Sequence, residues 1–169
     1  LPVIFLPLAT SHHTGNFSVR LDPGKDFFFE NEIGMSTVDQ NLYSPLDDKD
    51  NTGFAYTAQL GKTKSPFYLH GKRMGVLGFK GKARYIDSKF RPLSRMSEVE
   101  HGRKWGMAEG KDWGESISEL TFEYAPVTSL EFVGELGTFQ QHAFSSTRMQ
   151  WETAFSHSET CQNTFFKYI

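Results

Sequence analysis

Residues 74–86, MGVLGFKGKARYI, alternate between two kinds of side chain over 13 positions. One side of the extended chain carries Leu77, Phe79 and Tyr85, and the other carries Lys80, Lys82 and Arg84. A period of two is that of a β-strand. Strands of soluble proteins usually run about five or six residues, whereas strands that cross a membrane run about 9 to 11. The stretch therefore predicts a long, two-faced strand of the membrane-barrel type.

The same period recurs along the chain, while helical periodicity is nearly absent. The other alternating segments are 27–35, 53–60, 120–124, 130–136 and 149–155. With 16 phenylalanines and a 15% aromatic share, the composition also favours β structure. The sequence predicts an all-β fold, an antiparallel up-and-down meander of about six or seven long amphipathic strands that forms part of a transmembrane β-barrel.

The connections between these segments differ in length. Pro126 cannot donate a ladder hydrogen bond, so residues 125–129 are predicted to be a hairpin loop. Longer polar connections are expected at residues 36–52 and 138–147. Residues 90–113 mix charges with Trp105 and Trp113, which predicts a long polar excursion between strands.

All 169 residues are predicted to form a single sheet or barrel segment. The first nine residues, LPVIFLPLA, and the last six, TFFKYI, lack polar tails. We therefore expect residues 1–169 to be a piece of a longer chain.

The two sides of the strands predict two environments. Side chains predicted to face a lumen are Lys80, Lys82, Arg84, Glu119, Glu123, Glu131 and Glu135. Side chains predicted to face lipid are Phe54, Tyr56, Leu77, Phe79, Tyr85, Phe122, Tyr124, Phe132 and Trp151. Opposed charges of opposite sign would stabilise such a polar wall by about 0.2 to 1 kcal/mol per pair.

This pattern predicts a wall of a β-barrel in the Gram-negative bacterial outer membrane, with a structural, transport or protein-export role. An open sheet in lipid would leave its edge N–H and C=O groups unpaired. The expected partners are therefore outer-membrane lipid and the rest of a larger barrel, together with a transported protein.

A soluble β-sandwich or barrel would produce the same alternation, because one face of its sheet is buried. Under this alternative the protein is periplasmic or extracellular and binds glycan or lipid through its aromatic side chains. Trp105, Trp113 and Trp151 would then be the first ligand contacts to test.

Two stretches carry a more specific signal: residues 34–60, GMSTVDQNLYSPLDDKDNTGFAYTAQL, and residues 83–107, ARYIDSKFRPLSRMSEVEHGRKWGM. They resemble segments of the very large bacterial outer-membrane barrels related to the translocon of the type 9 secretion system. An Asp-x-Asn-x-x-Ser loop and an Asp-Asn-x-Gly motif of that group fit Asp39, Asn41, Ser44, Asp50, Asn51 and Gly53. A Phe-Arg-x-x-x-Arg and a Val-Glu-x-x-Arg-x-Trp motif fit Phe90, Arg91, Arg95, Val99, Glu100, Arg103 and Trp105, although His101 and Gly102 follow Glu100. The resemblance implies a barrel wall, protein export and no catalytic residues.

The acidic stretch within residues 43–56 also invites a metal hypothesis. Asp48-x-Asp50-x-Thr52-Gly53 begins like an EF-hand calcium loop. The twelfth position, however, is Gln59, a neutral amide where the loop needs a bidentate carboxylate. The sequence predicts no metal site here but a polar loop between strands, with calcium binding by Asp48 and Asp50 as the minor alternative.

Signals for enzymatic chemistry are absent. The six histidines lack zinc-ligand spacing, and Cys161 has no basic neighbour in sequence. Glu123 and Glu131 could form a glycosidase pair, but the acids recur regularly, as a charged wall requires. With a net charge of −2, the chain has no general attraction to nucleic acid. We predict no enzyme, no cofactor and no nucleic-acid partner.

Overall fold

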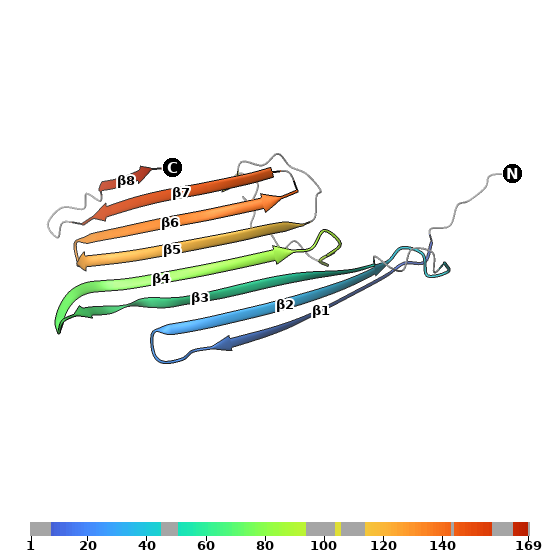
Figure 1. Ribbon diagram of the computed structural model, residues 1–169, viewed down its shortest axis with the longest axis horizontal. Coiled ribbons are helices and arrows are strands. Elements are labelled where there is room, and N and C mark those ends of the chain that lie inside the picture. Colours follow the sequence, from blue (N-terminus) through green and yellow to red (C-terminus); the bar gives the residue numbers. More distant parts are fainter. Residues whose placement is uncertain are drawn as a thin grey trace.

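The alternating stretch at residues 74–86 lies in β4, Lys72–Ile86, within a single antiparallel sheet of the computed structural model (Figure 1). Eight strands follow one another in chain order, each paired with the next. The other strands are β1 Ser11–Leu21, β2 Phe27–Asp39, β3 Thr52–Leu69, β5 Glu115–Val127, β6 Leu130–Gln141, β7 Phe144–Phe155 and β8 Thr164–Tyr168. The structure describes residues 8–44, 51–93, 104–105, 114–142, 144–156 and 164–168. The predicted all-β, antiparallel meander is confirmed.

The strands are long, because β1 to β7 each contain 11 to 18 residues. The described residues form eight strands where about six or seven were expected, and alternation predicted neither β1 nor β8. Within the described residues, the outer edges of β1 and β8 have no neighbouring strand, so the sheet is open.

Two loop predictions, at residues 125–129 and 138–147, need correction. Pro126 lies inside β5, at a register shift between Tyr124 and Val127, rather than in a loop. Such irregularities accommodate a residue that cannot donate to the ladder. Residues 138–147 are mostly strand, because only two residues separate β6 from β7. Between β3 and β4, His70 and Gly71 both have positive φ, as a tight hairpin turn requires.

The register assigns each strand side chain to one of two faces. Directly opposed residues point to the same side of a sheet. Lys82 of β4 lies opposite Gln59 of β3 and Glu119 of β5. Gly137 of β6 lies opposite both Glu119 and Arg148 of β7, so these residues share one side. We call this side the polar face. The opposite side, which carries Phe54 and Phe122, is the apolar face.

Two small cores sit on the polar face rather than on the apolar one. The first contains Ala55, Ile86 and Phe90, and the second contains Trp105, Ile117 and Phe139. Phe90 and Trp105 follow β4 in sequence, so the chain after this strand returns over the polar face. These two residues belong to the predicted polar excursion 90–113, of which the structure describes only residues 90–93 and 104–105.

Residues 87–93, here called the crossing segment, run back over three strands. Asp87 N donates to Phe54 O of β3 (2.8 Å), and Arg91 N donates to Ser36 Oγ of β2 (2.8 Å). On β1, His12 Nε2 donates to the carbonyl oxygen of Arg91 (2.7 Å). The crossing segment is therefore tied to β1, β2 and β3 by separate hydrogen bonds.

Gly53 makes room for this segment, because a Cβ at that position would collide with the backbone of Lys89 and Phe90. We expect Gly53→Ala to lower the free energy of unfolding by about 1 to 3 kcal/mol, the usual cost of overpacking. Gly15→Ala is the matched control, since nothing lies within 4 Å of the added methyl group. Urea unfolding of both variants measures the difference, and equal stabilities would contradict the packing of the crossing segment on β3.

Candidate functional site

The structure separates the two predicted sets of side chains completely. All seven residues predicted to face a lumen lie on the polar face, and all nine predicted to face lipid lie on the apolar face. Their contact with a lumen or with lipid stays a prediction. Asp48 and Asp50, the residues of the minor calcium alternative, lie outside the described residues, as do Trp113 and Cys161.

The apolar face is unusually open to its surroundings. Phe17 is 68% exposed, Phe54 52% and Met149 57%. The others that are at least two-fifths exposed on this face include Leu60, Tyr85, Leu120, Phe122, Leu136 and Trp151. In an antiparallel sheet of a soluble protein, the apolar face packs on a core and the polar face meets water. Here the apolar face is the uncovered one, and the polar face carries both cores.

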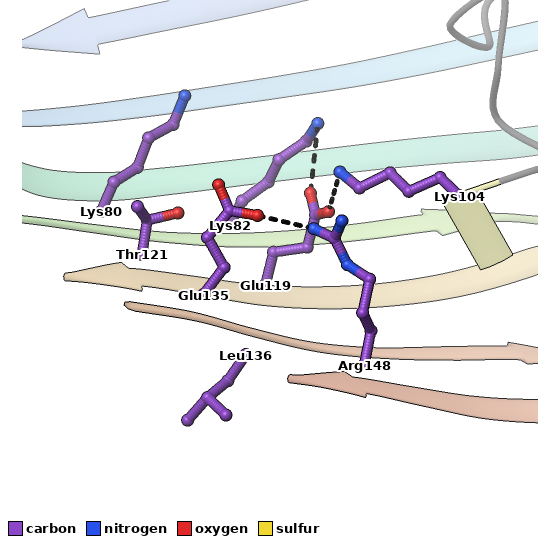
Figure 2. Close-up of a pocket in the computed structure, with 8 residues that line it drawn as sticks. All are labelled: Lys80, Lys82, Lys104, Glu119, Thr121, Glu135, Leu136 and Arg148. Carbon is purple, nitrogen blue, oxygen red and sulfur yellow. Dashed lines mark hydrogen bonds and ion pairs between the residues drawn. The ribbon is translucent and has the colours of Figure 1, made fainter. Parts of the chain in front are cut away.

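Glu119 is the centre of the charged site on the polar face. Lys104 Nζ lies 2.5 Å from Glu119 Oε1, and Lys82 Nζ lies 3.8 Å from Glu119 Oε2. Beside them, Arg148 Nη2 is 2.7 Å from Glu135 Oε2. Figure 2 shows that these side chains come from β4, β5, β6 and β7 and meet the side chain of Lys104, which lies between strands.

Further ion pairs extend this site along the strands. Arg84 Nη2 lies 3.1 Å from Glu115 Oε1, with both side chains only 11% exposed. Lys64 Nζ lies 2.8 Å from Glu123 Oε2 and 2.5 Å from Glu131 Oε1. Lys64 therefore bridges the carboxylates of Glu123 and Glu131. This ion pairing does not favour the hypothesis that the two glutamates are a glycosidase pair. Near the β1 edge of the same face, Arg20 of β1 pairs with Glu30 of β2.

Sequence reasoning missed four of these cations: Arg20, Lys64, Lys104 and Arg148. A register shift between Lys62 and Ser65 turns Lys64 onto the polar face, against the alternation of the preceding residues. Arg148 was detectable, because it directly precedes the alternating segment 149–155 and keeps its period. Lys104 gave no periodic signal, since it lies between strands.

Trp105 fixes the position of Lys104. Its ring stacks on Phe139 at a centroid distance of 5.5 Å. Lys104 Nζ and Arg148 Cζ lie 5.8 and 5.9 Å from the same ring, within cation–π range. Gly137 leaves the necessary space, because a Cβ there would stand 2.7 Å from Trp105 Cη2. Trp105 is 2% exposed, so it is buried in this structure rather than presented to a ligand.

The charged groups surround a depression of about 190 Å³. It is lined by Lys80, Lys82, Lys104, Glu119, Thr121, Glu135, Leu136 and Arg148. The side chain of Leu136 points away from the charged groups, toward the apolar face (Figure 2). The depression can bind charged or polar groups by ion pairing and hydrogen bonding.

No protein-family model, curated protein or solved structure matches this chain. The described residues contain no helix that is both long and apolar enough to cross a membrane. Nor do the described parts of the chain bring three His, Cys, Asp or Glu side chains together as metal ligands.

The contact of Lys104 with Glu119 can be measured by a double-mutant cycle with Lys104→Met and Glu119→Gln. Both side chains are about one-quarter exposed or less, so we expect a coupling free energy of about 1 kcal/mol in urea unfolding. The control cycle uses Arg20→Gln and Asp22→Asn, because the Arg20 and Asp22 side chains are 58% and 55% exposed. No measurable coupling is expected there. A Lys104–Glu119 coupling as small as the control would mean that the contact does not stabilise the fold.

Proposed function

We propose that the chain is a wall segment of a bacterial outer-membrane β-barrel with a structural, transport or protein-export role. The proposal rests on one observation: compared with a sheet of a soluble protein, the apolar and polar faces have exchanged environments. Large apolar side chains are exposed on one face, while ion pairs and both small cores lie on the other. Lipid-facing and lumen-facing positions of a membrane barrel alternate in this way.

The extent of the exposed apolar surface supports the proposal. Soluble monomers rarely expose contiguous apolar patches beyond a few hundred Å². On this sheet, exposed apolar side chains extend from Phe17 on β1 to Trp151 on β7. In water this surface would be unfavourable, whereas in hydrocarbon it requires no covering layer.

The position of the crossing segment supports the same orientation. Irregular backbone is tolerated at membrane depth only where protein buries it or where it lines a water-filled space. The crossing segment and Trp105 both contact the polar face, and neither packs on the apolar face. A lumen on the polar side would therefore hold these segments away from lipid.

The open edges of β1 and β8 would each require a neighbouring strand in a membrane. Unpaired N–H and C=O groups along β1 and β8 would be costly in lipid. Under the proposal, both edges pair with further strands of a larger barrel or with one another. Eight is also the smallest strand number of single-chain bacterial barrels.

Fractionation of cells tests the proposal directly. The chain is expressed in a Gram-negative host together with the coding sequence that flanks it. We expect the protein to stay in the outer-membrane fraction after carbonate and urea washes, with heat-modifiable mobility in gels. Recovery as a soluble monomer would reject the barrel wall and favour the soluble β-sheet protein that binds glycan or lipid.

A pair of adjacent substitutions tests the orientation of the faces. Phe122→Arg places a charge on the apolar face near the middle of β5, and Thr121→Arg places it on the polar face. In a membrane wall, Phe122→Arg should cost about 2 to 4 kcal/mol, whereas Thr121→Arg, which lies opposite Glu135 on the polar face, should cost less. Unfolding in lipid vesicles gives both values. Equal effects of the two substitutions would contradict the assignment of the apolar face to lipid.

A further inference from the structure

The depression around Glu119 holds more positive than negative charge. Four cations, Lys80, Lys82, Lys104 and Arg148, face two carboxylates, Glu119 and Glu135. An excess of two positive charges remains within about 190 Å³. Lys80 is exposed, but Lys82, Lys104 and Arg148 are only 21% to 26% exposed, so water compensates the charge of these three cations incompletely.

Two donors at the depression lack a partner among the described residues. Arg148 Nε is buried and has no hydrogen-bond acceptor there. Within the same part of the chain, the ammonium group of Lys80 forms no ion pair, and no dashed line joins it to Glu119 or Glu135 in Figure 2. Lys82 reaches Glu119 only at 3.8 Å. Lys80 is exposed and can be hydrated, whereas a buried donor such as Arg148 Nε is normally satisfied. Arg148 Nε therefore calls for an additional acceptor.

A second depression on the polar face shows that the positive excess is local. It measures about 170 Å³ and lies over β1, β2 and β3. Its lining contains one cation, Arg20, against the carboxylates Glu30 and Glu32. The two depressions therefore have opposite net charge on one continuous face.

We infer that the depression lined by Lys80, Lys82, Thr121 and Arg148 binds a phosphate group. A phosphate group carries a charge near −2 at neutral pH and offers several strong acceptor oxygens. These properties match the excess of two positive charges, the Thr121 hydroxyl and the unpaired N–H of Arg148. One water occupies about 30 Å³ in the liquid, so the depression has room for the ion and for waters around it. The inference rests on the polar face alone and holds whatever covers the apolar face.

Isothermal titration with inorganic phosphate tests the site, using the purified chain in detergent micelles at an ionic strength of about 0.1 M. We expect saturable binding that Lys80→Gln weakens about tenfold, as for the loss of one charge-assisted contact. Arg20→Gln is the matched control: it removes a cation from the same face, three strands away from β4 and therefore beyond about one Debye length at 0.1 M salt. Absence of saturable binding, or equal weakening by both variants, would overturn the inference.

A gain of affinity separates binding from misfolding. Glu135→Gln removes the carboxylate that holds Arg148 and raises the positive excess, so phosphate should bind several-fold more tightly. A destabilised variant cannot produce this result, and unchanged or weaker binding would exclude Arg148 from the site. A parallel titration with short-chain phosphatidic acid identifies the source of the phosphate group. Tighter binding of the lipid assigns the site to a headgroup, and tighter binding of inorganic phosphate assigns it to the dissolved ion.

Discussion

The register that places Lys82 between Gln59 and Glu119 determines the face of every side chain in the central strands. A slip of one residue in any strand would move its ions to the other side. The pairing then continues through Gly137 to Arg148, so four strands deliver their charges to one surface. The ion pairs add to this constraint, because Arg84 with Glu115 and Lys82 with Glu119 join directly neighbouring strands. Backbone pairing and electrostatics thus select the same register.

Residues outside the strands complete both apolar cores of the polar face. Phe90 and Trp105 fill spaces that two strand glycines, Gly53 and Gly137, leave open. Each aromatic residue brings polar neighbours with it. Arg91 N reaches Ser36 on β2, and Lys104 reaches Glu119 on β5. The connection after β4 therefore contributes to both the stability and the charge of this face.

Alternation in the sequence predicted the central strands because both faces there have a clear chemical character. It missed β1, SHHTGNFSVRL, because polar side chains occupy both sides of its first half. Pro126 was misassigned to a loop because an irregular register accommodates it within β5. The same limit applies to Lys64, whose face depends on a register shift that no local pattern reveals. The docking of Phe90 and Trp105 depends on contacts with distant strands, and single-sequence periodicity carries no information about such contacts.

Most charges of the polar face are neutralised in pairs, so the remaining field depends on a few unpaired groups. Lys64 bridges two carboxylates, and Arg84 is matched by Glu115. The depression at Glu119 keeps a positive excess, whereas the depression at Arg20 keeps a negative one. Low-dielectric walls focus such fields, so charge segregation acts on ions that approach the surface. In the lumen of a barrel, the two depressions would draw anionic and cationic groups of one cargo to different strands. The pattern of unpaired charge, rather than the net charge of −2, would then decide what the wall attracts.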